Sequence, residues 1–377
     1  MTLNLLQVAP QVHEMAYEVG ARRRALARQR DVALGLMREW GGAERLDALR
    51  ELVRAEQPWL VAEPLEPLCA AHPSPDLPPD ATIVATDGSS IDLDRHGLAQ
   101  CYLINVGAAV IRYGAAPDAA LSAQAALYYR DEDLYLDGGT ETRVAIQGAL
   151  LDLKRTLAEQ ERALELARAL RGRGPVVVVM DGTLLLWRLG GRAAEEAYVA
   201  EAIAAYGAGL DEFRRLGVPV CSYISRPNGH EVTNLLRLAA EAGDALAPLP
   251  DRDLMQHLRP GERSARFASR SPVLKYYGPD ARVAFVYLHV GDEVARVEAP
   301  GWVGDDPATL DLVHAVVYDG CRRGWGYPPA LAEAHEQAII RGADRDAFMG
   351  MVMEALNSAD HPAELSAKRL SKNRRAV

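Results

Sequence analysis

Cysteine is scarce in this sequence, and the few cysteines lie far apart. The chain has four of them, Cys69, Cys101, Cys221 and Cys321. No two form a C-x-x-C pair, so neither a thiolate zinc site nor a disulfide framework is expected. We expect the four thiols to be small side chains that are buried or half-buried.

Long apolar runs are missing as well. No stretch of about 18 uncharged apolar residues occurs, so a transmembrane helix is not expected. The N-terminus lacks the basic-then-apolar order of a signal peptide. These absences predict a cytoplasmic protein with no membrane partner.

Positive charge is in the minority. Acidic residues outnumber lysine and arginine by 52 to 42, which gives a formal net charge of −10. This balance argues against a protein that coats nucleic acid with its whole surface. A locally basic groove remains compatible with it.

Hydrophobic patterning predicts a mixed α/β fold in four parts. These are a helical arm over residues 1–61, a proline-rich linker over 62–80, one mixed α/β domain over 81–345, and a C-terminal helix with a basic tail over 346–377. In the domain, strands are expected at 82–87, 98–114 with a turn near Gly107, 175–180, 217–225, and 281–300 as a pair turning near Gly291. Helices are expected at 141–171, 194–216, 307–322, 329–341 and 344–356.

Two stretches bring an aspartate and a glycine to the end of an apolar strand. They are "TIVATDGSS" from Thr82 and "VVVVMDGTLLLW" from Val176. In open α/β sheets, ligands gather at the carboxyl ends of strands. Asp87 and Asp181 are therefore expected on neighbouring strand ends, each followed by a glycine that permits a sharp turn. Facing carboxylates repel unless a cation or proton lies between them, and a hard divalent metal is the simplest solution.

Two other motifs share part of this pattern and fit poorly. Haloacid-dehalogenase phosphatases need D-x-D-G-[TV], but the position of their nucleophilic aspartate is Val179 here. Actin-like ATPases use Asp-x-Gly-Thr/Ser turns, whereas Asp and Gly are adjacent in both copies here. A metal pair that works without a covalent intermediate is the interpretation left.

The long helix before the second aspartate offers a further carboxylate ligand. Arg155 and Glu159 are four residues apart and share one helical face, while Glu161 and Glu165 share another. Glu159 is favoured because a face that also carries Arg155 and Arg162 would suit a phosphate path. Spacing alone leaves Glu161 and Glu165 open, and each glutamate could simply be solvated.

A histidine near the C-terminus is the last candidate ligand. In "GYPPALAEAHEQAII", Pro328 opens a predicted helix and His335 follows two turns later. This histidine could be a packed core residue, a metal ligand or a contact to the transition state.

One segment interleaves basic and aromatic residues. Residues 257–278 carry Arg259, Arg263, Arg266, Arg270 and Lys275 together with Phe267, Tyr276 and Tyr277. Such a mixture suits single-stranded DNA, through phosphate charge and base stacking. The alternative is an ordinary solvated loop.

Five pieces in this order resemble the NurA nuclease family: "TIVATDGSS", "DLKRTLAE", "VVVVMDGTLLLW", "VAFVYLHVGDEVARVEAP" and "GYPPALAEAHEQAII". The resemblance covers about residues 80–345. It implies an RNase H-like fold and a divalent-metal nuclease, usually Mn²⁺-dependent, with Mg²⁺ as the alternative ion. It further implies 5′→3′ exonuclease and single-strand endonuclease activity, and dimers that dock on a hexameric HerA helicase-translocase for resection of DNA ends.

The resemblance also implies roles for single residues. Asp87, Glu159, Asp181 and His335 would hold one or two metal ions for hydrolysis of the phosphodiester bond. A polar family motif would fall in "CSYISRPNGHE", where Tyr223, Ser225 and Arg226 are candidates for DNA contact. The helical arm, with its basic "ARRRALARQR", would be either a solvated face or a contact to a second copy or to HerA.

Two competing interpretations remain at this stage. One is a catalytically inactive RNase H-like adaptor that binds DNA or a translocase. The other is a metal-dependent phosphatase that acts on small molecules. Retained carboxylates disfavour the first, since an inactive site has no physical need for clustered negative charge.

Overall fold

The structure is a computed structural model, and it describes residues 4–55, 60–92, 99–136, 143–186, 193–241, 249–278 and 281–359. The chain divides into two compact units, each made from separated segments. The first combines residues 1–75, 223–272 and 282–305, and the second combines residues 76–222, 273–281 and 306–377. Most of the expected basic tail, from residue 360 on, lies outside the described residues.

The first unit joins N-terminal helices to a small set of antiparallel strands. Its helices are α1 (Leu5–Trp40), α2 (Leu46–Arg54), α6 (Glu231–Ala239), α7 (Asp251–Leu254) and α8 (Gly301–Gly304). Its strands are β1 (Glu63–Pro64), β2 (Ala71–His72), β10 (Arg263–Ser264), β11 (Phe267–Ala268), β12 (Val283–His289) and β13 (Val294–Pro300). The last two pair antiparallel on either side of Gly291, as predicted.

The segment expected to be a linker contributes to this unit. Within it, β1 pairs with β11 and β2 pairs with β10, both antiparallel. Ala62 and Leu68 are fully buried in the same hydrophobic core as Met37 and Phe285. Proline content predicted a linker here, but proline is also accepted in short edge strands such as β1.

The second unit contains the long strands and the helices that cover them. Its main strands are β3 (Thr82–Ile91), β4 (Tyr102–Arg112), β5 (Asp118–Tyr128), β8 (Val176–Asp181) and β9 (Val220–Ile224), in the order β9-β8-β3-β4-β5. Its main helices are α4 (Ala149–Leu170), α5 (Ala193–Leu216), α9 (Pro307–Arg323), α10 (Pro329–Ala338) and α11 (Gly342–Ser358). Short elements α3 (Asp131–Leu134), β6 (Tyr135–Leu136) and β7 (Val144–Ala145) connect β5 to α4.

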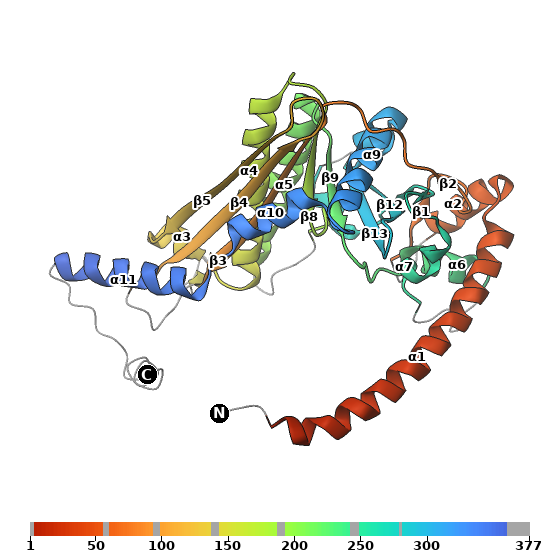
Figure 1. The fold of residues 1–377 in the computed structure, drawn as a ribbon, viewed down its shortest axis with the longest axis horizontal. Helices are drawn as coiled ribbons and strands as arrows, with labels where there is room; N and C mark the ends of the chain where they lie inside the picture. The colour runs from red at the N-terminus through yellow and green to blue at the C-terminus, as the bar shows by residue number, and fades with distance from the viewer. Residues whose placement is uncertain are drawn as a thin grey trace. The chain divides into compact units, whose positions relative to one another are not determined.

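Helices cover both faces of this sheet (Figure 1). α4 packs on β3 and β4 and against α5, while α10 crosses β3, β4 and β5 on the other face. β3, β4 and β5 are successively antiparallel, whereas β8 returns parallel to β3 after α4. All five residues of the run Val176–Met180 are buried, as expected for a central strand covered on both faces. The predicted mixed α/β sheet flanked by helices is confirmed.

Three local predictions differ from the structure. Gly107 was expected at a turn but lies within the continuous strand β4. The long helix begins at Ala149 rather than near residue 141. The strand β5 was not predicted, because its alanine-rich sequence has low β-propensity and little apolar alternation.

None of the helices in the described part of the chain combines the length and the apolar character needed to cross a membrane.

Candidate active site

Two neighbouring parallel strands bring the two aspartates together. In the register of β3 and β8, Thr86 lies opposite Met180. Asp87 and Asp181 are the next residues on these two strands, so they lie side by side just beyond the last paired residues of β3 and β8. The predicted proximity of the two carboxylates therefore follows directly from strand register.

The glycines that follow the two aspartates have different roles. Gly182 has a φ of +81°, so it makes the sharp turn expected after Asp181. Gly88 lies inside β3, which continues to Ile91, and makes no turn. A Cβ at Gly88 would collide with the carboxylate of Glu159 and lie 2.7 Å from the Cγ of Arg155. Gly88 therefore gives α4 room to bring Glu159 close to Asp87.

Asp87 is held by its own backbone and by a histidine from α10. Its Oδ1 accepts a hydrogen bond from the N–H of Gly88 at 2.8 Å. Its Oδ2 lies 2.6 Å from Nδ1 of His335, so the imidazole donates the proton of this bond. His335 is 63% exposed and Asp87 20%, which leaves the pair accessible from solvent.

Close packing of α10 on the sheet places His335. A Cβ at Gly107, which pairs with Asp87 across β3 and β4, would collide with the α10 backbone at Ala334 and Ala338. Asn105 on β4 donates hydrogen bonds from Nδ2 to the carbonyls of Gln337 at 3.1 Å and Ala338 at 2.9 Å. The glycine thus serves a close helix–sheet approach rather than the predicted turn.

Glu159 is the buried carboxylate of the group. Its side chain is 15% exposed, and its backbone carbonyl accepts a hydrogen bond from Thr86 Oγ1 at 3.1 Å. Burial raises the pKa of Glu159 to about 8, and the negative charges of Asp87 and Asp181 add to the increase. Arg155, whose Nε lies 3.4 Å from Oε1 of Glu159, offsets only part of this effect.

Asp181 has a partner that the sequence did not reveal. The hydroxyl of Tyr327 donates to Oδ1 of Asp181 at 3.2 Å. Burial raises the pKa of Asp181, and the charge of Asp87 raises it further, whereas the Tyr327 hydrogen bond lowers it. The available signal was the position of Tyr327 directly before the Pro-Pro start of the helix that carries His335.

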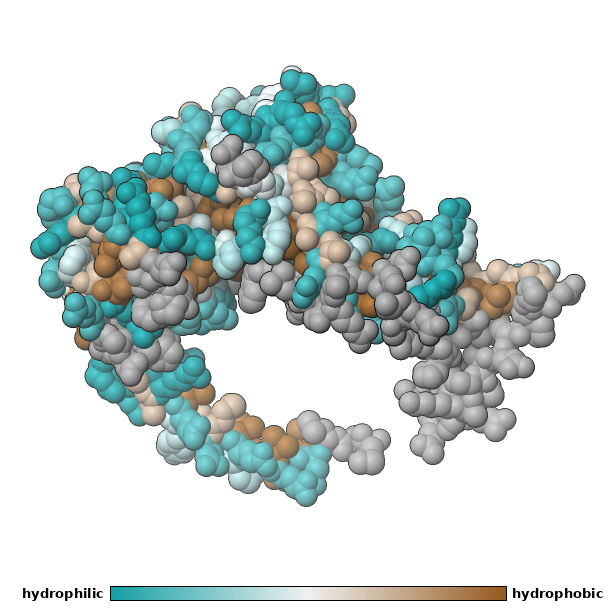
Figure 2. Space-filling model, turned by 180° about the vertical axis from the view of Figure 1, so that it is seen from behind, coloured by the Kyte–Doolittle hydropathy of each residue, from teal (hydrophilic) through white to brown (hydrophobic). Residues whose placement is uncertain are grey.

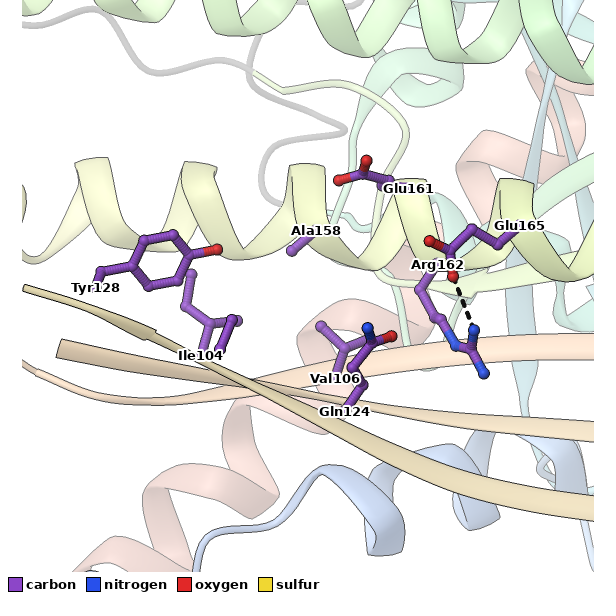
Figure 3. Close-up of a pocket in the computed structure, with 9 residues that line it drawn as sticks. Ile104, Val106, Gln124, Tyr128, Ala158, Glu161, Arg162 and Glu165 are labelled. Carbon is purple, nitrogen blue, oxygen red and sulfur yellow. Dashed lines mark hydrogen bonds and ion pairs between the residues drawn. The ribbon is translucent and has the colours of Figure 1, made fainter. Parts of the chain in front are cut away.

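The two alternative glutamates of α4 lie elsewhere. Glu161 and Glu165 line a groove of about 230 Å³ between α4 and the strands β4 and β5 (Figure 3). The floor is largely apolar and includes Val106, and Glu165 pairs there with Arg162 at 2.8 Å. Glu159 instead lies close enough to both aspartates for their charges to raise its pKa.

The donor chemistry of this site suits a hard divalent cation. Three carboxylates and an imidazole are ligand types that such ions accept, and the raised pKa of Glu159 shows negative charge that a cation would relieve. In the described parts of the chain, however, no group of three or more His, Cys, Asp or Glu side chains is already arranged to hold one ion. The residues fit a metal in type, and their side chains would have to turn toward it.

Two of the predicted DNA-contact arginines are used inside the first unit. Arg263, with a side chain 6% exposed, places Nη1 3.2 Å from Oε2 of Glu66. Arg266 places Nε 2.7 Å from the other oxygen of Glu66 and donates to the carbonyl of Gly304 at 2.6 Å. Burial opposes ionisation of Glu66, yet the two arginines keep its pKa below the ordinary value. These contacts give both arginines a structural role.

The other predicted DNA contacts differ in exposure. Arg270 and Lys275 are exposed, as a DNA contact requires. Arg226 is 78% exposed and lies 3.5 Å from Glu293. Tyr223 is fully buried on β9, so its side chain is not available to DNA in this structure.

One family model and two solved structures match this chain. The family model described as "NurA domain" matches residues 81–340. Two solved structures are similar to the chain. The NurA nuclease from Sulfolobus solfataricus is 14% identical, with 95% of this chain and 98% of that chain covered and a TM-score of 0.48. LC9-RNase H1, a type 1 RNase H with the type 2 active-site motif, is 16% identical, with 46% and 76% covered and a TM-score of 0.22. The comparison with curated proteins gave no match. Because the family model spans well over half of the sequence, the chain belongs to the NurA domain family.

Proposed function

We propose that this protein is a divalent-metal-dependent DNA nuclease. One observation carries the proposal: Asp87, Glu159 and Asp181 come from two neighbouring strands and a facing helix, and their charges oppose one another. A protein keeps such a cluster at a cost in stability, so the cluster is expected to serve a ligand. Membership of the NurA domain family supports a nucleic acid as the substrate.

Mn²⁺ or Mg²⁺ would be held by Asp87, Glu159 and Asp181, with His335 as a nitrogen ligand or a contact to phosphate. Such an ion, when bound, lowers the pKa of a water and offsets the charge of the phosphate under attack. Carboxylate oxygens are the preferred ligands of both ions.

Other residues of the chain would orient these groups. Tyr327 donates its hydroxyl proton to Asp181 and so restricts the rotation of that carboxylate. His335 does the same for Asp87, and its second ring nitrogen, Nε2, would face the substrate. Arg155 restrains Glu159 from its own helix face, one turn away. None of these groups is required to form a covalent bond to the substrate.

The family resemblance supports further parts of the proposal. We propose 5′→3′ exonuclease and single-strand endonuclease activity, a role in resection of DNA ends, a HerA-type hexameric ATPase as partner, and a homodimer as the working form. These features rest on membership of the NurA domain family.

The decisive experiment measures Mn²⁺-dependent release of nucleotides from end-labelled DNA, alongside phosphate release from small esters. We expect D87N and D181N to lose at least ~10²-fold in rate, which corresponds to roughly 2.7 kcal/mol at the barrier. Glu159→Gln should lower the rate of cleavage to a similar extent. Glu161→Gln is on the same helix but in the groove of Figure 3, and it should retain the wild-type rate.

Each other outcome would point to a different function. DNA binding without any cleavage by the wild-type protein would indicate an inactive adaptor. Phosphate release from small esters with intact DNA would indicate a phosphatase. Wild-type cleavage by a correctly folded D87N or D181N variant would refute the site.

We further propose that Arg270 and Lys275 contact the phosphates of single-stranded DNA. Both are exposed, and Tyr276 lies close to Lys275, whose Nζ is 4.8 Å from the centre of its ring. The double variant R270A/K275A should bind DNA about 3- to 10-fold more weakly and show a flatter salt dependence, because phosphate contacts release counterions. An unchanged salt slope would remove this segment from the DNA path.

A further inference from the structure

The helix α1 carries one apolar stripe over most of its length. Counting Leu5 as position a of a heptad, the following a positions are Val12, Val19, Leu26 and Ala33. All five are apolar. The d positions Val8 and Met15 are apolar too, and Arg22 interrupts the stripe at the next one. Gln29 occupies the d position after Arg22, so a and d are both apolar over residues 5–19. Over that stretch the repeat of 3.5 residues is the pattern of a helix that pairs with another helix.

The two ends of this stripe have different surroundings. Ala33 is fully buried in the hydrophobic core of the first unit, and Leu26 packs against that core. Toward the N-terminus the same stripe is exposed, with Leu5 67%, Val12 48%, Met15 56% and Val19 41% accessible. Figure 2 shows apolar residues in brown along this exposed part of the helix. Contiguous apolar surface of this kind marks an interaction site.

We infer that residues 5–19 of α1 pair in parallel with the same residues of a second copy of the chain. β-branched side chains at a positions favour two-stranded parallel pairing, and valine occupies two of the three a positions in this seam. The inference rests on the homodimer of the proposed function and assigns a surface and an orientation to it.

Charge complementarity identifies a second copy as the partner. Glu18 is at position g and Arg23 at the following e position, and both are exposed. In a parallel pair, g of one helix lies next to the following e of the other, so Glu18 of each copy meets Arg23 of the other. An antiparallel pair would instead bring g next to g and e next to e, and would lose both attractions. The sequence thus favours its own copy in one orientation.

Residues that would disturb the pairing lie outside the seam. Pro10, within the helix, is at position f, on the side opposite a and d. Leu6, 87% exposed, is at b, and Tyr17, 82% exposed, is at f. Leu6 and Tyr17 are exposed like the a and d residues of this stretch but lie on another face of the helix, so they provide matched controls.

The first experiment follows the oligomeric state of the full-length protein by light scattering and sedimentation over a dilution series from about 1 to 100 μM. We expect a dimer whose dissociation constant rises at least ~100-fold in V12K/V19K. The control Tyr17→Lys should leave the constant within about twofold of wild type. A monomeric wild-type protein over the whole range, or a dimer insensitive to V12K/V19K, would overturn the inference.

The second experiment tests orientation by charge exchange. Glu18→Arg and Arg23→Glu should each raise the dissociation constant several-fold to about tenfold, since each change places like charges across the interface twice. The double variant E18R/R23E should return the constant to near the wild-type value. Failure of this rescue would exclude the parallel pair, even if V12K/V19K dissociates the dimer.

A dimer held elsewhere would be recognised in the same assay. The strand β5 also exposes apolar side chains, with Leu121 44% and Leu127 46% accessible. Dissociation by L121K/L127K together with insensitivity to the α1 variants would place the interface on β5. None of these measurements uses DNA cleavage. A result that overturns the α1 interface would therefore leave the proposed nuclease activity untouched.

Discussion

Each unit of the chain contains a cluster of three acidic side chains, and the two clusters are balanced differently. In the first unit, Arg296 pairs with Glu231 and lies 2.8 Å from Glu298. The nearby carboxylate of Asp251 accepts hydrogen bonds from the N–H groups of Val232 at 3.0 Å and Thr233 at 2.8 Å. Every one of these carboxylates has a donor from the chain itself.

In the cluster of the second unit, the arginine is placed differently: Arg155 pairs with one of the three carboxylates, Glu159, whereas Arg296 pairs with two in the first cluster. Asp87 and Asp181 raise the pKa of Glu159 beyond the effect of burial, and Arg155 only partly opposes them. Buried charge that the chain pairs internally stabilises one structure, whereas charge left facing like charge is available for an external cation. The difference supports the proposal that the cluster of the second unit binds a cation, although both clusters are composed of the same residue types.

The largest effect is expected from removing the resident cation of the first cluster. Arg296→Met would leave Glu231 and Glu298 buried without their partner, at a cost of about 3–5 kcal/mol in the free energy of unfolding. Urea denaturation followed by circular dichroism measures this change. Arg322→Met removes a pair with Asp319 in which the arginine is 68% exposed, and it should change the free energy of unfolding far less, because solvent screens an exposed pair. Equal effects of the two variants would contradict the contrast between the clusters.

In the second cluster, replacing a carboxylate is expected to raise the free energy of unfolding, by less than the loss expected for Arg296→Met. In metal-free buffer, the raised pKa of Glu159, about 8 against an ordinary 4.5, means that the folded protein keeps a proton that the unfolded chain has released. Stability therefore falls as pH rises from about 4.5 to about 8, and the full loss persists above that range.

Glu159→Gln should remove this loss. The variant should be more stable than wild type at pH 8 by on the order of 2 kcal/mol, less than the whole shift implies because side chains and water relax. At pH 4.5 the two proteins should be similar. Urea denaturation at both pH values measures the difference, and Mn²⁺ should stabilise only the wild type strongly. Parallel stability–pH curves for the two proteins would show that the environment of Glu159 does not raise its pKa.

The smallest effect is expected from the tyrosine that orients one carboxylate. Tyr327→Phe removes the hydroxyl that donates to Asp181 and should lower the rate of DNA cleavage about 10-fold, near 1.4 kcal/mol. The binding of Mn²⁺, followed by calorimetry, should weaken only slightly because all carboxylates remain. Tyr129→Phe, an exposed tyrosine beyond β5, is the control. A variant at full rate would limit Tyr327 to a packing role.

Some features of the site followed from local pattern. The apolar runs of β3 and β8 and the aspartates after them predicted two carboxylates side by side on neighbouring strands, and strand register agrees. The predicted strand end at Asp87 was wrong, because β3 continues to Ile91. The two Asp-Gly pairs also looked alike, yet Gly88 accommodates Glu159 while Gly182 turns the chain. Local sequence cannot separate these roles, because a close approach depends on a helix more than 60 residues away.

The sequence by itself determined the strands β3, β8, β12 and β13, the family, and the carboxylates of Asp87 and Asp181, because these depend on local periodicity and short motifs. Only the tertiary structure distinguished Glu159 from Glu161 and Glu165, since helical spacing defines faces but not which face meets the sheet. The same holds for Tyr327 beside Asp181 and for Arg263 beside Glu66, which are pairs far apart in the chain. Contacts of that range depend on packing of the whole unit, and no local pattern encodes them.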